Sequence, residues 1–166
     1  MAFCLLLTPV MADEQPLYSD PKTDNERIRI TANELETDNE KNRAIFIGDV
    51  RATQGDTVIT CQRLTIYYGD KALSGGGGAG SVDRVIATET VKIIMENRIA
   101  VSDKAEYSMK TGEIILTGEP AKVTTGNNSV AGKKITVNRN NNRMNVERGT
   151  SQRVEAVLYP EEDNGE

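Results

Sequence analysis

The stretch ITCQRLTI, residues 59–66, carries the pattern that decides the fold. It reads apolar, any residue, small, polar, charged, apolar, and the same order returns as ITANELET at 30–37, AVSDKAEY at 100–107 and VAGKKITV at 130–137. Because a strand sends alternate side chains to opposite faces, the first apolar position of this octad is expected to point inward. The small residue is expected where the backbone bends, and the second apolar residue is expected to return to the interior.

The small position of the octad is occupied by Ala32, Cys61, Ser102 and Gly132. A thiol in a position otherwise held by small residues is interpreted as a buried small hydrophobe rather than as a reactive nucleophile. The polar and charged residues that follow are interpreted as a pair at the bend that faces water. Three lysines recur there and are interpreted as a solvated face, with contacts to phosphates at a groove rim as the alternative: Lys104, Lys133 and Lys134.

The order of elements is repeated along the chain. The segment AIFIGDVRATQG at 44–55 resembles IILTGEPAKVTTG at 114–126, with Gly48 and Gly118 in equivalent positions 70 residues apart. The segment QRVEA at 152–156 resembles the segment DRVIA at 83–87 and begins a third copy of the repeat. Two stacked copies of a β-unit of about 70 residues are typical of an open, quasi-linear β-stack and not of a closed barrel.

The body of the chain is predicted to be all-β. From Arg27 onward, short β-branched runs alternate with turn signals rich in Gly, Asn and Asp, and no stretch shows helical periodicity with caps. At the usual strand length, the body holds about a dozen or more short strands. The first is expected over 27–31 and the last over 154–159, just before Pro160.

The beginning of the chain is predicted to be an export signal. Residues 2–12 are uncharged and mainly apolar, too short a run to span a membrane, and cleavage is expected between Ala12 and Asp13. No basic residue precedes the run, and a buried N-terminal strand is the alternative. The domain boundaries that follow are a signal peptide at 1–12, a flexible leader at 13–26, a β-body at 27–160 and a disordered tail at 161–166. The exported chain then keeps one thiol, Cys61, and no intramolecular disulfide.

Composition and motifs exclude several classes of function. The 166 residues include no His, which removes His-based catalysis and zinc sites that need imidazole. The net charge of −5 disfavours nucleic-acid binding. The run GGGGAG at 75–80 lacks the following helix that a dinucleotide site requires, and is interpreted as a flexible hairpin loop. Asp49 and Glu119 each follow a repeat-equivalent Gly and are interpreted as turn residues rather than an acid/base pair. No enzyme activity, catalytic residue, metal site or cofactor is predicted.

Several short motifs follow one another in a fixed order along the β-body. They are Ile28-Arg29-Ile30-Thr31-Ala32, Phe46-Ile47-Gly48-Asp49-Val50 with Thr53-Gln54-Gly55, Ser102-Asp103-Lys104-Ala105-Glu106-Tyr107, Leu116-Thr117-Gly118, Gly132-Lys133-Lys134-Ile135 and Arg153-Val154-Glu155-Ala156-Val157-Leu158-Tyr159-Pro160. Through the order and spacing of these motifs, the chain resembles the OstA-like family of periplasmic lipopolysaccharide-transport proteins over about residues 27–160. Two departures from the family pattern are the Gly-rich loop at 75–80 and Pro120 in place of an apolar residue.

This resemblance implies a fold, a location and a set of partners. The fold is a twisted, open-ended β-jelly roll built from two stacked antiparallel β repeats. Its interior would carry the acyl chains of lipopolysaccharide from the inner to the outer membrane across the periplasm. Copies would join end to end and connect an inner-membrane anchored partner to an outer-membrane barrel assembly. The alternatives are a self-polymerising β-scaffold without lipid transport and a β-stack enzyme acting on carbohydrates, which lacks a plausible carboxylate dyad.

Strand alternation predicts which side chains face the interior. Ile28, Ile30, Tyr107 and Met109 match positions where the family's groove meets lipid, as the resemblance implies. The alternative for the middle of the set is packing in a closed core. The predicted lipid-binding residues are Ile28, Ile30, Leu35, Phe46, Ile59, Leu64, Ile66, Val91, Ile93, Tyr107, Met109, Leu116 and Ile135, and Val137 is expected on the same face.

Overall fold

The structure is a computed structural model, and it describes residues 28–69, 82–141, 143–150 and 153–160. These residues form ten strands, all paired antiparallel in one sheet, and no helix. The predicted all-β class is therefore confirmed. The predicted signal peptide with its cleavage site, the leader, the Gly-rich loop and the tail all lie outside the described residues.

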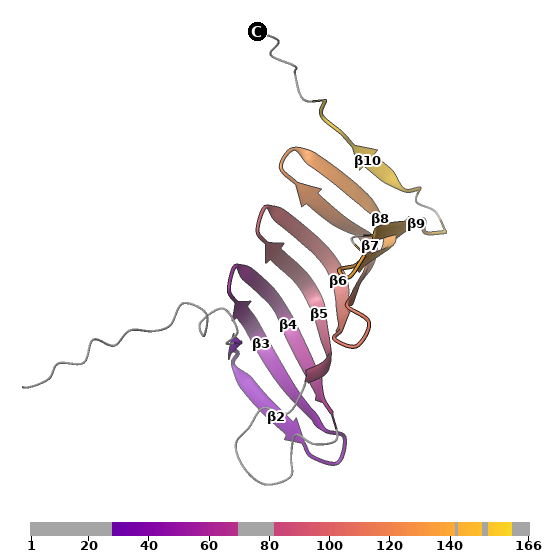
Figure 1. Cartoon of the computed structure of the whole chain (residues 1–166). Coiled ribbons are helices and arrows are strands. Elements are labelled where there is room, and N and C mark those ends of the chain that lie inside the picture. Colours follow the sequence, from indigo (N-terminus) through magenta and orange to yellow (C-terminus); the bar gives the residue numbers. More distant parts are fainter. Residues whose placement is uncertain (1–27, 70–81, 142, 151–152, 161–166) are drawn as a thin grey trace, which may run out of the picture.

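The strands follow one another across the sheet in nearly the order of the chain (Figure 1). Each edge of this open sheet is formed by two short strands instead of one long one: β1 and β2 both pair with β3, and β9 and β10 both pair with β8. The bounds are β1 Arg29–Thr31, β2 Glu34–Asp38, β3 Arg43–Gln54, β4 Thr57–Tyr68, β5 Val82–Met95, β6 Arg98–Ser108, β7 Glu113–Thr125, β8 Asn128–Asn138, β9 Arg143–Glu147 and β10 Glu155–Val157.

The expectation of a dozen or more short strands is wrong, because the six central strands have 11 to 14 residues each. Two predicted turns cause the error. Gly48-Asp49 lies inside β3, with φ of +78° and +47°, and Glu119 lies inside β7. These residues interrupt the pairing without ending the strand. In contrast, the terminal strands β1 and β10 have three residues each and are shorter than the predicted strands over 27–31 and 154–159.

The interruptions line up across the sheet. Every pairing among the six central strands shifts register near its middle, and we call this line of irregularities the seam. The shifts fall between Ile47 and Val50, Thr60 and Arg63, Thr88 and Val91, Val101 and Lys104, and Thr117 and Ala121. The small octad residues Cys61, Ser102 and Gly132 lie on it, so their expected place at a bend is confirmed. At Gly132 an added Cβ would come within 2.6 Å of Val146 and 2.8 Å of the Glu147 carbonyl oxygen, so β9 requires a glycine there.

The seam separates two arms, each with a continuous apolar row. Directly paired residues of an antiparallel sheet share a face, so each row can be followed from edge to edge. The first arm holds Ile30, Ala52, Ile59, Ile93, Ala100, Val123, Val130 and Ala156. The second arm holds Leu35, Phe46, Leu64, Ala87, Ala105, Leu116, Ile135 and Val146.

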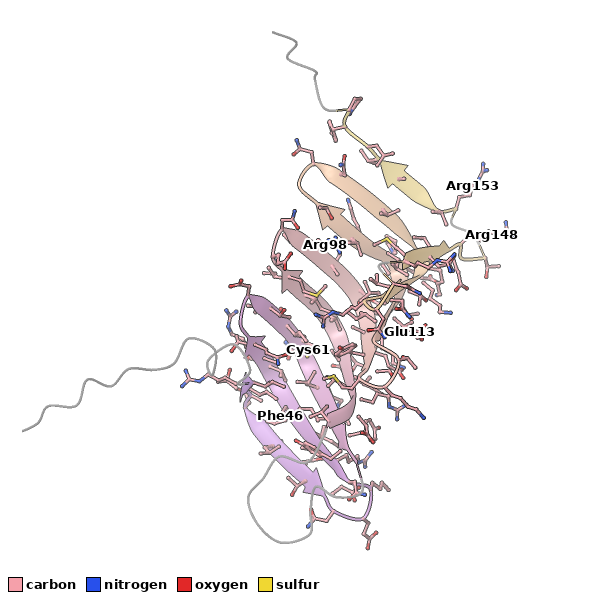
Figure 2. All side chains as sticks on the ribbon, viewed as in Figure 1. Phe46, Cys61, Arg98, Glu113, Arg148 and Arg153 are labelled. Carbon is pink, nitrogen blue, oxygen red and sulfur yellow. The ribbon has the colours of Figure 1, made fainter. Side chains whose placement is uncertain are left out.

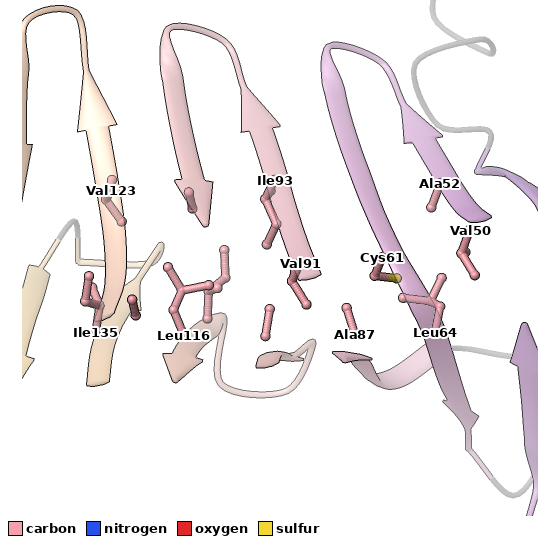
Figure 3. Packing of buried hydrophobic residues seen from close by; sticks show 14 of the residues in the cluster. Val50, Ala52, Cys61, Leu64, Ala87, Val91, Ile93, Leu116, Val123 and Ile135 are labelled. Carbon is pink, nitrogen blue, oxygen red and sulfur yellow. The ribbon is translucent and has the colours of Figure 1, made fainter. Parts of the chain in front are cut away.

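The core lies between these two arms. A single flat sheet cannot bury a face, yet the central residues of both rows are buried and belong to one cluster. Figure 3 shows side chains of both rows, among them Ile93 and Leu116, pointing into a shared interior. The sheet is therefore bent along the seam so that its two arms face each other. The 70-residue repeat is confirmed as a structural one, because β3 with β4 corresponds to β7 with β8 at that offset.

Replacing Ser102 by Ala is expected to stabilise the fold. Its Oγ is buried on the seam and has no hydrogen-bond partner among the described residues, and an unsatisfied buried polar group costs about 1 kcal/mol or more. Urea unfolding should show a higher midpoint for Ser102→Ala with an unchanged slope. The matched control is Ser108→Ala, which removes an Oγ that accepts the Thr111 N–H at 3.3 Å and should lower the midpoint. A lower midpoint for Ser102→Ala would contradict this reading of the seam.

Candidate functional site

An apolar groove opens between the two arms in the half of the sheet nearest β1. Its volume is about 120 Å³, and it is lined by residues of β1 and β3 to β7, by the segments next to them and by the turn after β8. Eight of the thirteen predicted lipid-binding residues line it: Ile28, Ile30, Ile59, Leu64, Ile66, Ile93, Tyr107 and Met109. They come from both arms, so the bend along the seam is what brings them together.

Three predicted residues belong to the closed core instead. Val91, Leu116 and Ile135 are no more than 2% exposed and do not line the groove, in keeping with the closed-core alternative for the middle of the set. Leu116 and Ile135 lie on β7 and β8, where the arms are packed together. The interior is thus open near β1 and filled toward β8, and Val137 packs against the filled part.

Two predicted residues lie near the first edge of the sheet. Phe46, which is labelled in Figure 2, is half-buried and packs against the core without lining the groove. Leu35 is 56% exposed, so its expected burial in the interior is wrong. Leu35 nevertheless lies on the face that strand alternation predicts, because it pairs with Phe46 in the apolar row of the second arm. No described strand lies beyond β2 to cover it.

Sequence reasoning missed part of the lining. The further apolar residues of the groove are Ala52, Val82, Val85, Ala87, Met95, Ala105 and Ile114. Most of them pair directly with predicted residues, as Val85 does with Ile66 and Tyr107, so following each row across its strands could have found them. Arg139 also lines the groove, and no strand pattern could have found it because it lies in the turn after β8.

Arg139 lies at one mouth of the groove and contacts Tyr107. Its Nη1 donates to the Tyr107 Oη at 3.4 Å, and the guanidinium carbon lies 5.9 Å from the centre of the ring. Two bonds hold the turn: the Arg139 N–H donates to the Gly112 carbonyl at 3.0 Å, and the Asn140 side-chain amide donates to the Thr111 carbonyl at 3.0 Å. The turn after β8 is thereby fixed to the turn after β6.

The bend lysines are paired with acids on the outside of the sheet. Lys104 pairs with Glu106 at 3.1 Å, Lys134 pairs with Glu147 at 3.0 Å, and Lys133 pairs with Glu119. All three side chains are partly exposed, which agrees with the predicted solvated face. Exposed pairs of this kind contribute little to stability.

The described residues include one thiol and no cluster of potential metal ligands. No group of three potential metal ligands occurs among them, and no helix in the described ranges is long and apolar enough to cross a membrane. The one described thiol, Cys61, is buried on β4 (Figure 2). Burial raises the pKa of Cys61 to about 11. The interpretation of this thiol as a small hydrophobe agrees with that environment.

Comparison with known proteins identifies relatives. A family model described as LptA/(LptD N-terminal domain) LPS transport protein matches residues 29–143. A crystal structure of LptH, described as the LptA-homologous periplasmic component of the lipopolysaccharide transport device of Pseudomonas aeruginosa, superimposes with a TM-score of 0.69 at 21% identity, over 84% of this chain and all of that one. The predicted jelly-roll fold is thereby confirmed. An uncharacterised protein of Rhizobium meliloti (strain 1021) is 24% identical over 115 residues, which are 69% of this chain and 62% of that protein.

Cys61 is expected to resist alkylation in the folded protein. An unperturbed thiol is about half ionised near pH 8.5, whereas a pKa of about 11 leaves Cys61 almost wholly protonated there. Iodoacetamide labelling at that pH, followed by peptide mapping, should be slow in buffer and fast in urea. Because the pKa is raised on folding, the protonated thiol's contribution to stability is full below about pH 9 and is lost as the pH rises through about 11. Equal labelling rates in buffer and urea would show that the thiol is accessible.

Proposed function

Because the chain belongs to the LptA/(LptD N-terminal domain) family of LPS transport proteins, we propose that it carries lipopolysaccharide across the periplasm by holding the acyl chains in its groove. The observation that carries this proposal is the groove itself, an apolar space open to solvent between two arms of a bent sheet. Each methylene that enters such a space gains about 0.8 kcal/mol. Burial of a few acyl chains is therefore enough to bind the lipid stably.

The groove favours transport over a purely structural role. A self-polymerising scaffold requires edges that pair, but it has no use for an unfilled apolar space in its interior. Exposed apolar surface is costly to keep unless a ligand or partner covers it. The proposed ligand is an amphiphile with several chains, because the lining comes from two rows of side chains and not from one narrow pocket.

The two edges of the sheet support assembly of copies end to end. Both β1 and β2 run antiparallel to β3, and both β9 and β10 run antiparallel to β8. Since β3 and β8 themselves run in opposite directions across the alternating sheet, the β9/β10 edge of one copy runs antiparallel to the β1/β2 edge of the next. The sheet can therefore continue from copy to copy with the same kind of pairing.

The apolar rows give this joint a register. If the rows continue, Leu35 of one copy lies opposite Val146 of its neighbour, and Ile30 lies opposite Ala156. Leu35 is exposed and Val146 only half-buried in the single chain, so the joint would cover both. The bent arms and the groove would then continue across it.

The same edges are the proposed contacts with other members of the pathway. An inner-membrane anchored partner and an outer-membrane barrel assembly would each add a strand to one end of the sheet. The proposed location is the periplasm, where the LptH relative is a component of the transport device. The predicted export signal would bring the chain there.

A photo-crosslinking residue at Ile30 or Tyr107 is expected to capture lipopolysaccharide. Both positions line the groove, whereas Arg29 on β1 and Lys104 on β6 lie on the opposite faces of the same strands and do not line it. The four variants should be purified after ultraviolet irradiation of cells and probed for lipid adducts. Adducts at the two inward positions at least several-fold above those at the outward positions are expected. Equal labelling inside and outside, or no labelling of folded protein, would contradict the groove as the lipid site.

Leu35→Lys is expected to abolish oligomers formed end to end. A charge placed opposite Val146 in the joint would be buried without a partner, which is strongly unfavourable, while the single chain tolerates it because Leu35 is already exposed. Light scattering over a range of protein concentrations measures the effect. The matched control is Glu36→Lys, one residue away on the opposite face of β2, which should keep the oligomers. Unchanged oligomers in Leu35→Lys would place the joint elsewhere.

A further inference from the structure

Among the residues that the structure describes, one charged side chain is directed toward the groove. Two charged residues contribute to its lining, Glu106 and Arg139. Glu106 follows Ala105 and precedes Tyr107, which both belong to inward rows, so strand alternation directs its carboxylate outward. That carboxylate pairs with Arg84 at 3.4 Å and with Lys104 at 3.1 Å. Arg139 is thus the charge that meets the groove.

Arg139 forms no ion pair with a carboxylate of the described residues, whereas Arg43, Arg84 and the three bend lysines do. Other exposed cations of the described chain are also without such a pair, and Arg139 is distinguished from them because it lines the groove. A guanidinium carries five N–H donors in a planar fork, and one of them is used on the Tyr107 Oη. Donors remain for a ligand with two or more acceptor oxygens.

The position of Arg139 is fixed before any ligand arrives. Its backbone N–H is held by Gly112, and its guanidinium lies over the Tyr107 ring. Tyr107 is itself an inward residue of the groove, and Met109, which is 40% exposed, lies at the same mouth. A chain that enters the groove would leave its polar end beside this guanidinium. Because the guanidinium is already ordered, less conformational entropy is lost when a ligand binds, and the binding free energy is more favourable.

The geometry points to Arg139 as the site that binds a phosphate group on the headgroup of the lipid whose chains fill the groove. This inference rests on the proposed function and adds a polar recognition element to it. A phosphate monoester matches the planar fork of arginine with two parallel hydrogen bonds. The chain as a whole carries a net charge of −5, so a local cation favours the approach of an anionic lipid to this mouth.

The test compares two lipids that differ only in phosphate. Dissociation constants of the purified full chain are measured for lipid A with its phosphates and for the same lipid A stripped of them. The wild-type protein is expected to bind the phosphorylated form about tenfold more tightly, the lower end of what a hydrogen bond to a charged group contributes. Arg139→Gln should lose that tenfold for the phosphorylated lipid and keep its affinity for the stripped one.

Two controls separate the headgroup contact from other causes. Arg51→Gln removes an exposed arginine of β3 that does not line the groove, and it should behave as the wild type. Circular dichroism should show Arg139→Gln folded, because the turn is held by the Arg139 backbone and by Asn140. Inorganic phosphate is added in a separate titration, to distinguish a free anion from a headgroup.

Each outcome bears on a different statement. Failure of the wild type to bind either lipid would remove the proposed function itself. Equal binding of the two lipids by the wild type, or a preference that survives in Arg139→Gln, would overturn the phosphate site while leaving the groove in place. If micromolar inorganic phosphate abolishes the difference between the lipids, the site takes a free anion and the headgroup assignment falls.

Discussion

The alignment of backbone irregularities across six neighbouring strands is the constraint on which the rest of the structure depends. One irregularity in one strand would twist it locally. Because each pairing shifts register at the same level, the whole sheet bends there, and one layer of strands encloses its own core. The groove and the buried thiol both follow from that bend.

Much of the fold could be predicted from the sequence, because it depends on local patterns. The octads identified the seam through their small residues, and the 70-residue offset identified the repeated strand pair. The number of strands could not be obtained in this way. Gly48 with Asp49 has the composition of a turn, yet it lies inside β3, since the neighbouring strands continue to pair on either side of it. Local composition does not distinguish a turn from a bulge held by its neighbours.

The candidate site was predictable in its apolar part and not in its polar part. Alternation placed Ile30, Ile59 and Tyr107 on the inward face, and all three line the groove. It could not tell which inward residues meet empty space and which meet one another, because that depends on the distance between the arms. Leu116 and Ile135 meet other core side chains and are buried among them. The position of Arg139 at the groove depends on a contact between two turns that are far apart in the sequence.

The two unlike edges of the sheet determine how an assembly of such chains would end. A joint between two different surfaces is heterologous, and such joints close into a ring only if the rotation between copies allows it. A bent sheet that continues through antiparallel pairing extends instead along its axis, with one kind of edge always left at each tip. Nothing in the pairing itself would stop growth, so the length of the assembly would be set by whatever caps its tips. Its polarity would make the two ends of the proposed lipid path different from each other.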